Sequence, residues 1–317
     1  MTSRRVVAAA IAALGVALAI PAQAQVAIAA RPKAPPAEAA APKANLRVDL
    51  NMVLVPVTVC DPMNRPVTGL ERDAFHIFDD NVEQTLTAFA QEDAPVAVGL
   101  VFDTSGSMGG KLRLSRQAAA AFFQTANPED EFFLVEFSDR PKLVVPLTGN
   151  TQEVQDHLTF SQSKGRTALL DAVMLALHEL KKSTIARKAL LIISDGGDNC
   201  SRYTETELKN MVRESDVMIY AIGIYGGGTT PEEMSGPQLL TEVAEQSGGR
   251  QLPAEGPDIP DIAAKIGVEL RNRYMLGYSP TAPHRDGRYH PVQVKIVPPR
   301  GLPALRAFWR RGYYAPD

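Results

Sequence analysis

Apolar and polar positions follow two different patterns along the chain, and the first of them is typical of β-strands. Met52–Cys60 is a continuous, Val-rich apolar run that is long for one strand and apolar on both faces. Residues 75–88 alternate between apolar and polar side chains around Asp79-Asp80-Asn81, which predicts a hairpin with its turn at these polar residues. Residues 46–93 are therefore expected to form an N-terminal β region.

From Val96 onward, apolar runs of strand length alternate with segments of helical periodicity. Leu170, Val173 and Leu177 recur every three or four residues, as one face of an amphipathic helix does. Strands that alternate with helices favour an α/β fold, in which helices cover both faces of a mostly parallel sheet. Strands are expected at 96–102, 132–137, 143–147, 189–193 and 217–224, and helices at 112–126, 170–180, 205–213, 238–247 and 260–271.

After Arg273 the pattern returns to strand-like alternation, as in Tyr274, Leu276 and Tyr278. Neither this C-terminal segment, residues 273–317, nor the N-terminal β region has enough strands for a stable core of its own. We therefore hypothesise that the two flanks together form one β module.

The first residues predict an export signal. Arg4 and Arg5 precede the apolar run Val6–Ile20, and Ala22-Gln23-Ala24 fits a signal-peptidase site with cleavage after Ala24. An uncleaved anchor is the alternative. Residues 25–45 are rich in Ala and Pro and are expected to form a linker, so the mature protein is expected in the periplasm or outside the cell.

Composition excludes several classes of function. The formal net charge of -3 gives no reason to expect a nucleic acid or an anionic membrane as partner. The five histidines show no zinc-binding spacing with each other or with cysteine. Cys60 and Cys200 either pair or act as two independent small residues, and the sequence leaves both alternatives open.

Polar side chains with oxygen donors gather where the predicted strands end. Asp103 and Asp195 each follow a buried strand, so both carboxylates are expected in one crevice beyond the carboxyl ends of the strands. Ser105, Ser107 and Thr167 add three hydroxyls in loops that lead into helices. Such a donor set suits a hard cation, Mg²⁺ or else Mn²⁺ or Ca²⁺.

These five residues resemble the metal-ion-dependent adhesion site of von Willebrand factor type A domains. The resemblance to this family covers roughly residues 94–250. The resemblance implies a Rossmann-like, doubly wound sheet with one antiparallel edge strand for residues 94–272. It also implies that the three hydroxyls touch the ion directly and that Asp103 and Asp195 act through water. The implied function is to bind a partner protein that supplies an exposed Asp or Glu carboxylate to the metal.

The flanks carry a narrower likeness to the exported "VWFA-related" proteins described from Acidobacteria, which combine an N-terminal β region, a central domain and a C-terminal β segment. The residues that carry this likeness are Val55-Pro56-Val57-Thr58-Val59, Gly69-Leu70, Asp73-Ala74-Phe75, Asp93-Ala94-Pro95 and Arg311-Gly312-Tyr313-Tyr314. The likeness supports the architecture more than a particular role.

Other interpretations of the same residues remain. Asp103 and Asp195 would be ordinary helix or turn caps if each stood alone, and Asp171 and Asp198 are not expected to be ligands. No Gly-x-Ser-x-Gly or His-Glu-x-x-His motif occurs, so an enzyme is not expected, and a metal-dependent hydrolase is the weakest alternative. A structural subunit of an envelope complex, with a loop rigidified by the metal, is the other alternative.

Overall fold

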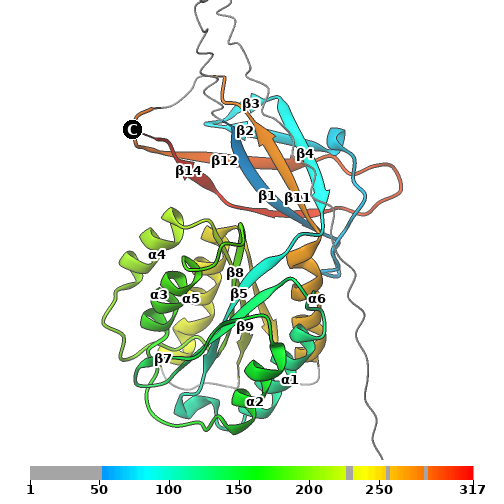
Figure 1. The fold of residues 1–317 in the computed structure, drawn as a ribbon. Helices are drawn as coiled ribbons and strands as arrows, with labels where there is room; N and C mark the ends of the chain where they lie inside the picture. Colours follow the sequence, from blue (N-terminus) through cyan, green and yellow to red (C-terminus); the bar gives the residue numbers. More distant parts are fainter. Residues whose placement is uncertain (1–51, 226–230, 255–257, 282–284, 317) are drawn as a thin grey trace, which may run out of the picture. The chain divides into compact units, whose positions relative to one another are not determined.

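The apolar runs from Val96 onward form a six-stranded sheet in the computed structural model (Figure 1). Its strands are β5 (Val96–Asp103), β6 (Glu131–Phe137), β7 (Pro141–Thr148), β8 (Arg187–Ser194), β9 (Val217–Ile224) and β10 (Gln251–Ala254). They lie in the order β10-β9-β8-β5-β6-β7, and all neighbours are parallel except β6 and β7. The mostly parallel sheet with an antiparallel edge strand is therefore confirmed.

The structure describes residues 52–225, 231–254, 258–281 and 285–316, all within one compact unit, Asp49–Asp317. The predicted signal peptide (residues 1–24) and linker (25–45) lie outside the described residues. In the part of the chain that is described, no helix has both the length and the apolar character needed to cross a bilayer.

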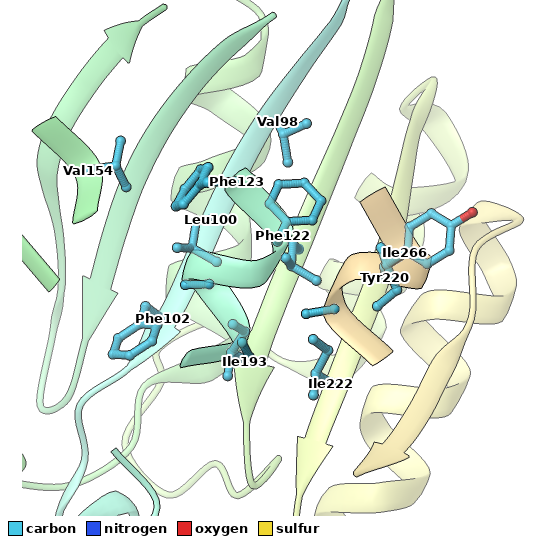
Figure 2. Packing of buried hydrophobic residues seen from close by; sticks show 14 of the residues in the cluster. Val98, Leu100, Phe102, Phe122, Phe123, Val154, Ile193, Tyr220, Ile222 and Ile266 are labelled. Atoms are coloured by element: carbon cyan, nitrogen blue, oxygen red, sulfur yellow. The ribbon is translucent and has the colours of Figure 1, made fainter. Parts of the chain in front are cut away.

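Helices cover both faces of this sheet (Figure 1). This explains why its central strand β5 is buried along its whole length and apolar as far as Phe102. On one face lie α1 (Leu112–Phe123), α2 (Thr151–Phe160) and α6 (Ile259–Arg271), and on the other lie α3 (Leu169–Leu180), α4 (Glu205–Glu214) and α5 (Pro231–Ser247). Figure 2 shows the first of the two cores, in which Phe122 and Phe123 of α1 pack beside Val98 and Leu100 of β5.

Three short elements were not expected from the sequence: α2, β10 and β14 (Gly312–Tyr314). Helix α2 buries only Val154 and Leu158, one turn apart, so its apolar stripe is too short to stand out. It is instead stabilised at its start, where the Asn150 side chain accepts a hydrogen bond from the Gln152 amide at 3.1 Å.

The two flanks pair with each other in two antiparallel sheets, which confirms the hypothesis of one β module. The first sheet is β13 (Arg306–Trp309), β1 (Val53–Cys60), β11 (Arg273–Tyr278) and β4 (Leu86–Glu92), and the second is β14, β12 (Tyr289–Ile296), β2 (Phe75–Asp79) and β3 (Val82–Gln84). Each sheet contains strands from both flanks, and side chains from both sheets share one apolar core. Neither flank can complete that core alone.

The predicted hairpin is correct at its turn and wrong in its second strand. Asp80 and Asn81 have positive φ angles of 47° and 66°, and β2 pairs across them with the short β3. Residues from Leu86 onward leave this sheet and pair with β11 in the other one. The change of sheet lets Leu86 join the core that both sheets share, which the local alternation does not reveal.

A buried polar network joins the β module to the helices and strands of the α/β domain. The Glu269 carboxylate on α6 is fully buried and accepts hydrogen bonds from the Tyr220 hydroxyl at 2.9 Å and from Nε of Arg250 at 3.2 Å. From β1, the Cys60 thiol donates to Glu269 at 3.8 Å, and the Thr58 hydroxyl lies 3.5 Å from that of Tyr220. The network therefore fixes one strand of the β module against the central domain.

The two cysteines are free thiols in separate places. Burial, and then the negative charge of Glu269, raises the pKa of the Cys60 thiol to about 12, so it stays protonated. Cys200 is half-buried, and its thiol donates to the Asp139 carbonyl oxygen at 3.6 Å. Of the two alternatives that the sequence leaves open, the structure shows independent cysteines.

Removing one partner of the buried pair Arg250–Glu269 is expected to be far more harmful than removing both. Glu269→Leu leaves the guanidinium of Arg250 buried without its carboxylate, so the free energy of unfolding should fall by about 3–5 kcal/mol. Arg250→Met/Glu269→Leu should regain most of that loss. Urea unfolding followed by circular dichroism measures both variants, and a double variant no more stable than Glu269→Leu would contradict the expectation.

Candidate metal centre

The predicted carboxylates lie at one edge of the six-stranded sheet. Strands β5 and β8 are parallel neighbours, so their carboxyl ends meet, and Asp103 ends β5 while Asp195 follows β8. Both residues are buried. Phe102 of β5 pairs with Ile193 of β8, so Asp103 and Asp195 stand at the carboxyl ends of two neighbouring strands.

The Asp103 carboxylate is held by two hydrogen bonds. One oxygen accepts from the Ser105 amide at 2.8 Å, and the other accepts from the Ser194 hydroxyl at 2.6 Å. Burial raises the pKa of Asp103 to about 6, the hydrogen bonds from the two serines oppose that rise, and the charge of Asp195 adds to it. Asp103 is therefore a carboxylate at neutral pH that stays close to taking up a proton.

The two predicted serines lie together in the loop after β5. Their hydroxyl oxygens are 3.1 Å apart, with Ser105 buried and Ser107 exposed. The carbonyl oxygen of Ser105 accepts from the Ser163 hydroxyl at 2.5 Å, and the Gly106 amide donates to the Gly165 carbonyl oxygen at 3.0 Å. The serine loop is thus fastened to the loop that carries Thr167.

Thr167 is buried, and its backbone is held on both sides by Asn199. The Thr167 amide donates to the Asn199 side-chain oxygen at 3.0 Å, and the Asn199 amide donates to the Thr167 carbonyl oxygen at 2.9 Å. Gly165, two residues earlier, has a φ of +82°, a left-handed conformation that favours glycine. The loop after β8 therefore positions the loop of Thr167.

Asp195 has one paired oxygen and one unpaired oxygen. Its Oδ2 accepts from the Lys111 ammonium at 2.9 Å. Its Oδ1 is buried and has no hydrogen-bond partner among the described residues. A buried carboxylate oxygen without a partner is unfavourable, and a cation is the kind of group that satisfies it. The donors at this edge therefore fit a cation site.

Two further aspartates nearby hold the backbone. The Asp198 carboxylate accepts from the Leu170 amide at 3.0 Å and so caps the start of α3. The Asp171 carboxylate accepts from the amides of Arg202 and Tyr203 at 2.8 and 3.0 Å. Both carboxylates thereby join α3 to the loop after β8.

Sequence reasoning placed Ser194 in the motif and Asn199 at its rim, but it gave neither of them, nor Lys111, the role of contacting a predicted site residue. Ser194 stands directly before Asp195, so its position at the end of a strand was a usable signal. Lys111 meets a carboxylate 84 positions away, and Asn199 meets Thr167 32 positions away. Those contacts depend on the fold and leave no trace in local spacing.

Comparison with known proteins identifies the domain that carries this site. The family model of the von Willebrand factor type A domain matches residues 98–197, a range that includes all five predicted site residues. A solved von Willebrand factor type A structure from Catenulispora acidiphila aligns with a TM-score of 0.51 and 14% identity, over 77% of this chain and 74% of that one. The chain therefore contains a von Willebrand factor type A domain.

Curated relatives match over shorter stretches. Inter alpha-trypsin inhibitor heavy chain 4 of Mus musculus is 28% identical over 156 residues, which are 44% of this chain and 17% of the mouse protein. A UPF0353 protein of Mycolicibacterium paratuberculosis is 31% identical over 112 residues, which are 32% of this chain and 34% of that protein. The chain thus spans a minor part of the length of both relatives.

The buried charge of Asp103 gives a testable pH dependence in metal-free protein. Folding raises the pKa of this carboxyl from 3.8 to about 6, so the folded state binds the proton more tightly and gains stability as pH falls through that range. At about pH 7 in EDTA, Asp103→Asn should therefore be more stable than the wild type, on the order of 2 kcal/mol. Chemical unfolding at a series of pH values measures the difference, which should vanish near about pH 4. A less stable Asn variant at neutral pH would refute this expectation.

Proposed function

We propose that the chain is a binding protein, without enzymatic activity, that holds a partner protein through a divalent cation. The cation would be held by Asp103, Ser105, Ser107, Thr167 and Asp195. The observation that carries this proposal is the buried Oδ1 atom of Asp195, which lacks a hydrogen-bond partner among the described residues. A second buried carboxylate, Asp103, stands at the end of the neighbouring parallel strand. Two carboxylates buried at the carboxyl ends of neighbouring strands are stabilised by a nearby positive charge.

The chemistry of the donors supports a hard cation. The five side chains offer three hydroxyl and two carboxylate oxygens, a set that suits Mg²⁺, with Mn²⁺ or Ca²⁺ as alternatives. When bound, such an ion supplies positive charge and a coordination position that a carboxylate of another molecule can fill. The partner is therefore a protein with an exposed Asp or Glu, and the charge of the chain gives no support for nucleic acid.

The surrounding residues prepare the donors before a partner arrives. Ser194 fixes one oxygen of Asp103, and the amide of Ser105 fixes the other. Asn199 fixes the backbone of Thr167. Donors that are already held lose little conformational entropy on binding, and this raises affinity. The domain also fits this role, since it belongs to a family that often mediates protein–protein interaction and adhesion.

The setting of this function is proposed to be outside the cytoplasm. Residues 1–24 have the charge, apolar run and small residues of a signal peptide, and residues 25–45 would tether the folded part after cleavage. Among the described residues there is no helix that would span a membrane. We place the mature protein in the periplasm or outside the cell.

Capture of the partner should depend on both the ion and the serine hydroxyls. In a pull-down from an envelope extract, we expect the partner to bind in Mg²⁺ and to be lost in EDTA, because the ion then no longer bridges the two proteins. Ser105→Ala/Ser107→Ala should lose the partner even in Mg²⁺, since two direct oxygen donors are missing. Mass spectrometry of the same mature protein tests whether it begins at Gln25.

Thr159→Ala is a matched control for this experiment, because it removes an exposed hydroxyl that donates within α2, to the Gln155 carbonyl oxygen at 3.0 Å. It should capture the partner like the wild type. Equal capture by wild type and double serine variant, or full capture in EDTA, would reject the adhesion-type function. The second result would favour a structural subunit in which the ion only stiffens the loop.

Lys111 is expected to weaken the binding of the cation. Its ammonium contacts the Asp195 carboxylate at 2.9 Å, so it both competes for that carboxylate and repels a second positive charge. Lys111→Met should therefore raise the affinity for Mg²⁺, on the order of tenfold, in isothermal titration calorimetry. Lys164→Met removes an equal charge from an exposed position in the neighbouring loop and should change the affinity far less. Weaker binding by Lys111→Met would show that the lysine instead supports the site.

A further inference from the structure

A second group of metal-ligand side chains lies in the β module, away from the strand edge of Asp103. It consists of Asp79 at the end of β2, Asp80 in the following turn, and His290 on β12. One potential ligand atom from each residue lies within 4.8 Å of the other two. Strands β2 and β12 are antiparallel neighbours, and they bring together residues from opposite ends of the chain.

The two ring nitrogens of His290 each meet a carboxylate. Nδ1 lies 2.7 Å from Oδ2 of Asp80, within the cluster, and Nε2 lies 3.1 Å from Oδ1 of Asp286, outside it. Histidines that bind metals commonly donate the proton of one ring nitrogen to a carboxylate, which fixes the ring and turns the lone pair of the other nitrogen toward the ion. If Nε2 donates its proton to Asp286, the lone pair of Nδ1 is on the side of Asp80 and would bind the ion.

Asp79 provides an independent sign that this place suits a cation. The residue is only 2% exposed, and its Oδ2 accepts from the hydroxyls of Tyr278 at 2.9 Å and Tyr313 at 3.0 Å. Its Oδ1 is buried and has no hydrogen-bond partner among the described residues. The unfavourable burial of that oxygen is removed when it coordinates a metal ion.

We propose that Asp79, Asp80 and His290 form a zinc site, with Asp286 as the positioning residue behind the imidazole. The donor atoms select the metal, because imidazole nitrogen together with carboxylate oxygen suits Zn²⁺ better than the all-oxygen preference of Mg²⁺ or Ca²⁺. The ion would join the hairpin of the N-terminal flank to β12 of the C-terminal flank. Histidine and aspartate stand 210 positions apart, which explains why sequence spacing gives no zinc motif.

A charged imidazole clamped between two aspartates is the competing explanation. Burial disfavours the imidazolium of His290, but the hydrogen bonds that its ring nitrogens donate to Asp80 and Asp286 outweigh burial and raise its pKa. Such a clamp needs no metal. It also leaves Oδ1 of Asp79 without a hydrogen-bond partner among the described residues. It predicts that substitutions in this cluster do not change the affinity of the chain for zinc.

The test uses the full chain with the serine pair already replaced, Ser105→Ala/Ser107→Ala, so that its outcome is independent of the proposed adhesion function. After removal of metals with EDTA and buffer exchange, titration with Zn²⁺ in a calorimeter should show one ion per chain. The visible spectrum with Co²⁺ should show the bands of a bound, low-coordinate ion. His290→Asn should abolish binding, and Asp286→Asn should weaken it by about 10- to 100-fold.

His76→Asn is the matched control, since His76 also lies on β2 and also contacts a carboxylate, Glu83 at 2.8 Å, but at the exposed surface. It should bind zinc as tightly as the parent. Asp286 is partly exposed, so its variant keeps the test decisive even if His290→Asn does not fold. Absence of zinc uptake by the parent, or equal affinity of Asp286→Asn and His76→Asn, would overturn the proposal.

Discussion

Two carboxylates buried side by side at the ends of β5 and β8 are the constraint on which the rest of the domain depends. Asp103 and Asp195 are forced together because their strands are parallel neighbours, and neither carboxylate has enough water around it to be stable alone. The groups around them compensate that charge. The Ser194 hydroxyl and the Ser105 amide hold Asp103, and the Lys111 ammonium holds one oxygen of Asp195. The remaining oxygen of Asp195 is the part that the described residues do not satisfy.

The loops around this edge form one connected structure. The loop of Ser105 is hydrogen-bonded to the loop of Thr167, which is hydrogen-bonded in turn to Asn199 after β8. Helices cover both faces of the sheet, so the strand ends remain the place where polar groups can gather (Figure 1). This architecture supports the proposed binding function at that edge, whereas the flanks contribute a separate β module with a core of its own.

Much of this arrangement follows from the sequence, since buried parallel strands read as continuous apolar runs and their ends mark one edge of a sheet. The places of the five oxygen-bearing residues in the fold could be predicted, because each stands close to the end of such a run or to the start of a helix. That they bind an ion stays a prediction. The contact between Lys111 and Asp195 could not be predicted, because the two residues lie on different loops. The sheet change at Leu86 was missed for a similar reason: alternation shows which side chains are buried but not which sheet a strand joins.

The proposed function requires that the five residues together hold a divalent ion. Electron paramagnetic resonance measures it directly, because free Mn²⁺ gives a strong signal that is lost when the ion binds protein. We expect the wild type to bind one Mn²⁺ per chain at this site in competition with Mg²⁺, and Asp195→Asn to lose that ion, since the unpaired carboxylate oxygen is then replaced by a neutral amide. Equal Mn²⁺ binding by the wild type and Asp195→Asn, or no binding by either, would contradict the account.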